Sequence, residues 1–210
     1  PWSRMDPAAF AAEFALRDQV CFDGRLTYTI HGDGAIHLAA HVAPNGALPP
    51  LPRIGLMLEV PQAFQNFTWY GRGPGESYPD RKQGMPMGIF RGMVDDQFVA
   101  YGRPQENGNK SDVRWATLTD DRGNGLRIAG VTPLNVSAHR FTAADLSKAR
   151  HPHEVVRRER IYCTVDFAHA GLANASCGPG VLPQYQIQPE TASFDLWIHP
   201  VAGEGAASST

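Results

Sequence analysis

The sequence lacks the features that mark several common protein classes. Its 19 basic and 21 acidic residues give a formal net charge of −2, so it offers no basic field for nucleic acid. It contains no apolar run of about 18 residues, the length that a membrane-spanning helix needs. Its three cysteines are far apart and form no Cys-x-x-Cys pair, which indicates neither a disulfide framework nor a zinc site. We therefore expect a cytoplasmic protein that binds neither nucleic acid nor membranes.

What the sequence does contain indicates a folded domain rich in strands. Hydrophobic residues make up 42% of its 210 positions. A chain of this size buries about 70% of its unfolded surface, so a core needs no disulfide support. The 21 glycines and 17 prolines exceed average usage, and such a chain turns often. Because no Met precedes Pro1, we expect a processed chain or a part of a longer one.

Alternating hydrophobicity predicts an antiparallel β-domain. We expect residues 1–25 to form a lead-in segment, residues 26–200 to form one folded domain, and residues 201–210 to form a flexible tail. Short strands are predicted at 26–30, 35–42, 54–60, 64–70, 113–118, 126–128, 135–138, 161–167 and 193–199. Regularly spaced short strands are typical of an antiparallel β-sandwich.

Turns, one helix and one long loop interrupt this pattern. Thr142 and Asp145 form a capping box that begins a short helix. Asp23 and Gly24 predict a turn ahead of the first strand. The stretch 71–93 is predicted to be a loop because it is rich in glycine and proline. Loops of this length in a compact domain are usually functional or mobile, which makes 71–93 a candidate functional segment.

Three loops carry a resemblance to a known family. Residues 69–81 read WYGRGPGESYPDR, residues 101–109 read YGRPQENGN and lead into DVRW, and residues 177–185 read CGPGVLPQY. Their order and spacing resemble the C-terminal domain of the β-galactosidases of glycoside hydrolase family two. The likeness extends over roughly residues 26–200. Three long loops in the same order are a far more specific signal than one.

The resemblance implies both a fold and a function. The implied fold is all-β, an antiparallel supersandwich of the galactose-mutarotase type with one short helix. The implied parent enzyme is a homo-oligomer that hydrolyses terminal β-D-galactose residues, for example those of lactose, with retention of configuration. In that family the two catalytic glutamates lie on a separate barrel domain, where Mg²⁺ and Na⁺ are also expected. This chain would then hold no catalytic residue and no cofactor, and its partners would be the remaining domains and the galactoside.

The same resemblance places one loop at the rim of the substrate pocket. In assembled enzymes of the family the third loop reaches the mouth of the active site. The residues implied at that rim are Cys177, Gly178 and Pro179. Some members of the family carry a Trp that stacks on sugar at the position of Cys177, and a cysteine cannot provide such a platform.

The acidic residues of the first two loops have a structural and a functional interpretation. Glu76 and Asp80 could pair with Arg72, Arg81 and backbone N–H groups to fix the loop, which we favour over a catalytic carboxylate pair. Glu106 follows the same logic, either in a turn paired with Arg103 or Arg114 or as a sugar hydroxyl acceptor. The residues expected to support the loops or to bind sugar are Arg72, Glu76, Tyr78, Asp80, Arg81, Glu106, Asn107, Arg114 and His139.

The histidines leave two alternatives open. His151 and His153 form the closest pair, but no third ligand is evident and we expect no metal site. A stand-alone aldose 1-epimerase would need a histidine acid and a glutamate base, and His139 or His169 would be the candidate acid. A non-catalytic carbohydrate-binding module would instead expose aromatic side chains such as Tyr78 and Tyr185 in a groove.

Overall fold

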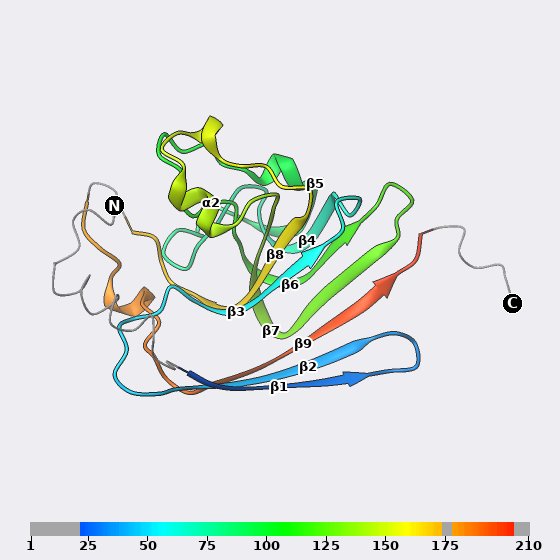
Figure 1. Cartoon of the computed structure of the whole chain (residues 1–210), viewed down its shortest axis with the longest axis horizontal. Coiled ribbons are helices and arrows are strands. Elements are labelled where there is room, and N and C mark those ends of the chain that lie inside the picture. Colours follow the sequence, from blue (N-terminus) through cyan, green and yellow to red (C-terminus); the bar gives the residue numbers. More distant parts are fainter. Residues whose placement is uncertain (1–21, 174–177, 204–210) are drawn as a thin grey trace, which may run out of the picture.

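The computed structural model describes residues 22–173 and 178–203 (Figure 1). The predictions made for residues 1–21 and 204–210 lie outside the described residues. None of the described helices is long and apolar enough to cross a membrane.

Antiparallel strands dominate the described part of the chain. The strands are β1 (Phe22–Ile30), β2 (Ile36–Pro44), β3 (Arg53–Val60), β4 (Asn66–Arg72), β5 (Met87–Met93), β6 (Lys110–Thr119), β7 (Gly125–His139), β8 (Ile161–His169) and β9 (Ala192–Val201). The helices are α2 (Ala143–Lys148) and the short 3₁₀ turns η2 (Val94–Gln97), η3 (Pro152–Glu154) and η4 (Pro183–Tyr185). The all-β antiparallel class is confirmed, with one short α-helix among residues 22–173 and 178–203.

The sheet branches at β7. One path of hydrogen-bonded strands runs β1-β2-β9-β7-β6-β4-β5, while β8 pairs with β7 and β3 pairs with β8. Residues 125–130 of β7 pair with β9, and residues 135–139 pair with β8. Gly130 lies where β7 changes partner, and a Cβ atom there would stand 2.3 Å from the Thr132 carbonyl oxygen. Two arms, β9-β2-β1 and β8-β3, therefore diverge from one strand (Figure 1).

The hydrophobic core joins the two arms. Leu38 of β2 and Leu196 of β9 belong to the same buried cluster as Val165 of β8. Phe167 of β8 stacks on Phe194 of β9, with ring centroids 5.4 Å apart. Burial of these side chains on alternate positions holds the arms face to face, as in a β-sandwich.

Three boundaries differ from the sequence predictions. β1 begins at Phe22, and the predicted turn at Asp23 and Gly24 is wrong because these residues pair with β2. Part of the predicted loop 71–93 is strand β5, which pairs with β4 on one side. β7 is a single strand of 15 residues where two short strands were predicted. In each case pairing with a distant strand overrides the local preference of glycine and its neighbours.

The helix boundary follows its capping residues closely. Thr142 Oγ1 accepts a hydrogen bond from the Asp145 backbone N–H, and the Asp145 carboxylate accepts one from the Thr142 N–H. Arg158 adds two hydrogen bonds to the same carboxylate and, as the main cause, holds the pKa of Asp145 far below its usual range. The predicted capping box is confirmed.

Candidate functional site

The three loops that carried the resemblance meet in one cluster. Ser77 of the first loop and Asn109 of the second exchange two hydrogen bonds, N–H to carbonyl at 2.8 Å and Asn109 Nδ2 to carbonyl at 2.7 Å. The Ala173 N–H, in the segment between β8 and the third loop that we call the base of that loop, donates to Asp80 Oδ2 of the first loop at 2.6 Å. Segments far apart in sequence thus pack together, and we call them the loop cluster.

Glu76 is the main tie between the first and second loops. Its carboxylate accepts hydrogen bonds from the Gly108 N–H at 2.8 Å, from Arg81 Nη2 at 2.6 Å and from the Tyr101 hydroxyl. Arg81 also lies over the Tyr78 ring, 4.8 Å from its centroid. The predicted loop-fixing role of Glu76 and Arg81 therefore agrees with the geometry, and no oxygen of Glu76 is left without a donor.

Asp80 ties the first loop to the third. Its Oδ2 holds the Ala173 N–H, and Ala173 adopts a positive φ of 50°, a conformation that a non-glycine residue seldom takes. Gly171 packs so closely that a Cβ atom there would lie 2.7 Å from the Asp80 carboxyl carbon. The Gly171 N–H donates to the Tyr185 carbonyl at 2.9 Å. The base of the third loop is thus fixed against the first.

Arg72 contributes to the loop cluster in a different way from the one predicted. It pairs with Asp112 at 2.5 Å and donates to the Lys82 and Met85 carbonyls at 3.1 and 2.9 Å, not to Glu76 or Asp80. Burial raises the pKa of Asp112, but hydrogen bonds from Lys82 and Arg72 outweigh it and leave that pKa below its usual range. Arg72 therefore closes the turn between β4 and β5.

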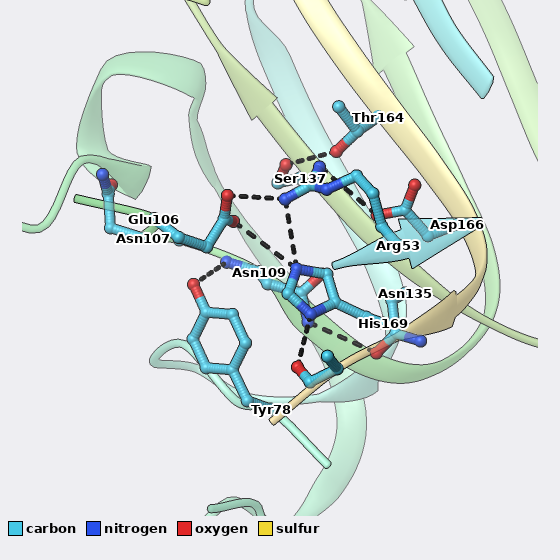
Figure 2. Close-up of polar contacts among 12 residues, drawn as sticks. Arg53, Tyr78, Glu106, Asn107, Asn109, Asn135, Ser137, Thr164, Asp166 and His169 are labelled. Atoms are coloured by element: carbon cyan, nitrogen blue, oxygen red, sulfur yellow. Dashed lines mark hydrogen bonds and ion pairs between the residues drawn. The ribbon is translucent and has the colours of Figure 1, made fainter. Parts of the chain in front are cut away.

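A second polar group surrounds Glu106, and Figure 2 shows its members facing one another. Arg53 Nη2 lies 2.5 Å from Glu106 Oε2 and 3.1 Å from His169 Nε2. His169 Nε2 lies 3.8 Å from Glu106 Oε1, and Arg53 Nη1 lies 3.4 Å from Asp166 Oδ2. The predicted pairing of Glu106 with Arg103 or Arg114 is wrong.

The reason for that error is the pairing of distant strands. β3 lies against β8, and this places Arg53, at the start of β3, opposite His169, at the end of β8. Arg114 is exposed on β6 and makes no ion pair with any described residue. Arg53 and Asp166 were missed by sequence reasoning. A usable signal was the charged Asp166 within the otherwise apolar buried positions of β8.

The pKa values of the two carboxyl groups beside Arg53 differ from their ordinary values in opposite directions. Burial raises the pKa of Asp166 to about 6, and the charges of Arg53 and His169 offset only part of that rise. Burial also raises the pKa of Glu106, but the His169 hydrogen bond and the Arg53 charge outweigh it and leave the pKa below normal. His169 Nδ1 donates to the Ala170 carbonyl at 2.7 Å, and its Nε2 lies 3.1 Å from Arg53 Nη2 and 3.8 Å from Glu106 Oε1.

His139 and Asn107 form the turn of the second loop. His139 is buried, stacks on Phe141 with centroids 4.5 Å apart, and donates from Nε2 to the Asn107 carbonyl at 2.9 Å. Burial lowers its pKa, so the ring is neutral near pH 7. Gly108 takes a φ of 77°, and a Cβ atom there would lie 2.5 Å from the His139 ring. The positive φ expected of the Asn-Gly pair is found at Gly108, and His139 packs beneath it.

The remaining site residues fall into two groups. Tyr78 is fully buried, and burial raises its pKa, so it is a core side chain rather than an exposed sugar platform. Gly178 and Pro179 are exposed, whereas Cys177 lies outside the described residues. Among residues 22–173 and 178–203, no group of three or more His, Cys, Asp or Glu side chains could hold a metal ion.

Comparisons with known proteins give a consistent picture. The family model described as β-galactosidase small chain matches residues 4–198. A β-galactosidase from Priestia megaterium is 34% identical over 171 residues, which cover 80% of this chain and 16% of that protein. One from Lactobacillus delbrueckii subsp. bulgaricus is 39% identical over 194 residues, which cover 92% of this chain and 19% of that protein. The chain thus spans less than a fifth of the length of these relatives.

A solved structure of a putative aldose 1-epimerase from Escherichia coli is also similar. The superposition covers 88% of this chain and 62% of the epimerase chain, with 9% sequence identity and a TM-score of 0.44. A TM-score this low does not identify the fold type, so the supersandwich remains an implication of the family resemblance.

Proposed function

The chain belongs to the β-galactosidase small-chain family, and we propose that it is the C-terminal, non-catalytic part of a β-galactosidase. The complete enzyme would hydrolyse terminal β-D-galactose residues with retention, using two carboxylates outside these 210 residues. The observation that carries the proposal is that 39% identity over 92% of the chain corresponds to only 19% of a β-galactosidase. We also expect a cytoplasmic, homo-oligomeric enzyme that binds Mg²⁺ and Na⁺ in its catalytic part.

Within that enzyme the loop cluster would shape the rim of the substrate pocket. The third loop, with Cys177, Gly178 and Pro179, would approach the galactoside. Asp80 fixes the base of this loop through the Ala173 N–H. The rim would then owe its position to hydrogen bonds between loops and not to a stacking aromatic.

The carboxylates of the loop cluster support a structural role. A retaining glycosidase needs one carboxylate as nucleophile and another as acid, about 5 to 5.5 Å apart. Glu76 accepts three hydrogen bonds, Asp80 holds a backbone N–H, and Glu106 is paired with Arg53. Each is engaged in fixing a loop, which supports catalytic groups supplied from elsewhere.

The geometry argues against the two alternatives. An aldose 1-epimerase needs its acid and base on either side of a sugar, yet Glu106 and His169 face each other at 3.8 Å, which leaves no room for a pyranose ring. His169 Nε2 is moreover already directed at Arg53. A carbohydrate-binding module needs exposed aromatic rings, whereas Tyr78 is buried and Tyr185 is half-buried.

An activity assay on two forms of the protein tests the proposal. The purified 210-residue chain should not hydrolyse a chromogenic β-galactoside, whereas the complete protein from its reading frame should. A variant of the protein that ends before Pro1 should be inactive, and adding the 210-residue chain to it should restore hydrolysis. Turnover by the chain alone that disappears in the Glu76→Gln, Glu106→Gln double variant would contradict the proposal.

A further inference from the structure

Strand β1 is patterned for a half-buried position that the described structure does not give it. Along β1 one face carries Leu26, Tyr28 and Ile30, and the opposite face carries Arg25 and Thr27. Strict alternation of this kind is typical of a strand with one face on a core and one face in water. Nevertheless β1 is exposed over nearly its whole length.

The register of β1 shows which face is uncovered. Directly opposite pairs across β1 and β2 are Leu26 with Ala40, Tyr28 with Leu38, and Ile30 with Ile36. Side chains of opposite residues project from the same face of a sheet. Leu38 and Ala40 are 2% and 4% exposed members of the core, whereas Leu26, Tyr28 and Ile30 are 46%, 57% and 75% exposed. The core face of the sheet therefore continues past the core.

We call Leu26, Tyr28 and Ile30 together with the unpaired backbone edge of β1 the β1 surface. Among the described residues, β1 pairs with β2 on one side and with no strand on the other. It is nine residues long and carries no proline and no register shift along β2. Natural sheets protect such edges with prolines, bulges, charges or a covering segment, and here the first two are absent.

The opposite edge of the same sheet provides a contrast. Strand β5 is also an edge strand, but its core-face side chain Phe90 packs against the core and lies 5.6 Å from the Trp69 ring. In β5 the core face is therefore covered, and the apolar side chains that it exposes, Met87 and Ile89, lie on its other face. In β1 it is the core face itself that is uncovered.

The chemistry of the β1 surface fits an added β-strand. The strand carries one acid, Asp23, and one base, Arg25, so no charge excess selects an ionic partner. An open backbone edge and a row of apolar side chains on the same strand are the two elements that β-augmentation uses. An extended segment with alternating apolar side chains would continue both the hydrogen-bond ladder and the core face.

We infer that the β1 surface binds a β-strand of the same parent polypeptide, from outside these 210 residues. The inference rests on the proposed function, in which this chain is one part of a longer β-galactosidase. The chain covers 16% and 19% of two relatives, so such proteins hold several times more sequence than the chain. A strand linked through the same polypeptide acts at a high effective concentration and needs no separate binding event from solution.

Hydrogen exchange of the β1 backbone tests the inference. In the 210-residue chain, amides of residues 22–30 that face the open edge should exchange rapidly. In the complete protein they should exchange at least about 100-fold more slowly. Equal exchange in the two forms would overturn the inference. Slow exchange of these amides already in the isolated chain would also overturn it. Slow exchange at every protein concentration would mean that the chain's own residues cover β1, and slow exchange only at high concentration would mean that a second copy does.

A matched pair of variants separates docking from stability. Ile30→Ser and Val131→Ser each remove an apolar side chain that is 75% or 70% exposed in the chain. Neither should change the melting temperature of the 210-residue chain by more than about 2 °C. In the complete protein, Ile30→Ser should restore rapid exchange of residues 22–30, and Val131→Ser should not. The same slow exchange in both variants would contradict the inference.

Galactosidase activity of the complete protein distinguishes the two proposals. Hydrolysis with an unprotected β1 would leave the proposed function standing and reject the added strand. Slow exchange of β1 in a complete protein that does not hydrolyse galactosides would support the added strand and reject the proposed function.

Discussion

The loop cluster and the β1 surface differ in how far this chain completes them. In the loop cluster, Glu76 alone receives three donors, and Ser77 and Asn109 bond to each other from different loops. At the β1 surface, Leu26, Tyr28 and Ile30 are 46%, 57% and 75% exposed, and the open strand edge pairs with no described strand. The comparison teaches that a long polar loop can be a finished structure while a regular strand remains incomplete.

The physical cause lies in the kinds of interaction involved. A buried carboxylate is costly unless donors surround it, so the loops must satisfy Glu76 within the chain. An exposed leucine or isoleucine costs far less and can remain uncovered until a partner arrives. Four predictions test this difference, starting with the largest expected effect.

Glu76→Ala should be the most damaging single change to the loop cluster. It leaves the Gly108 N–H, Arg81 and the Tyr101 hydroxyl without their shared acceptor. The free energy of unfolding should fall by about 3 to 4 kcal/mol. Chemical denaturation measures this, with Glu190→Ala, an exposed carboxylate between the third loop and β9, as control. Equal effects of both variants would show that the loop cluster is not held by Glu76.

Asp166 should give the stability of the chain an unusual pH dependence. Its pKa is about 6 in the folded chain, above its ordinary value, so the folded state binds the proton more tightly than the unfolded state. The contribution is therefore fully present below about pH 4 and is lost as the pH rises through 6, by up to about 3 kcal/mol.

Comparison with Asp166→Asn isolates this contribution. The unfolding free energy of the variant, followed by denaturation from pH 4 to 7, should lack the decline assigned to Asp166. Glu106 and Asp112 have lowered pKa values, so their stabilising contributions are lost only as the pH falls through those lower values. If the stability of the variant depends on pH in the same way as that of the unaltered chain, the raised pKa does not belong to Asp166.

Asp80→Ala should loosen the third loop with a smaller loss of stability. It removes the acceptor of the Ala173 N–H, so the unfolding free energy should fall by about 1 to 2 kcal/mol. The Ala173 amide should also exchange faster in the isolated chain. In the complete enzyme KM for a galactoside should rise more than kcat falls. Unchanged exchange at Ala173 would show that another contact fixes the loop base.

Tyr28→Ser should have the smallest effect, although Tyr28 lies directly opposite a core residue. Its side chain is 57% exposed, so the unfolding free energy of the isolated chain should change by about 0.5 kcal/mol or less. Leu38→Ala, across the strand pair, should cost about 2 to 5 kcal/mol. Similar losses for both variants in thermal unfolding would mean that the core extends over β1.

The sequence predicted that the acidic residues fix the loops, but it predicted their ion-pair partners less well. The ion pair of Glu76 with Arg81 joins residues close in sequence, and the positive φ of Gly108 follows from a local conformational preference. The partner of Glu106 is Arg53, 53 positions away, and only the pairing of β3 with β8 places it there. No local pattern carries that information.

The same limit applies to the strands. The sequence predicted a strand at 26–30, but a strand prediction cannot report whether anything covers the apolar face of that strand. Asp23 and Gly24 favour a turn locally, and pairing with β2 overrides them. Strand β5 was missed because Gly88 and Gly92 weaken its pattern, whereas its ladder with β4 is complete.

The branch at β7 links the two compared regions. From β1 the hydrogen-bonded ladders run through β2 and β9 into β7, and from β7 into β8. β8 ends at His169, and the third loop departs two residues later at Gly171. A strand added to β1 would therefore lie at one end of a continuous set of hydrogen-bonded ladders whose other branch ends where the third loop departs.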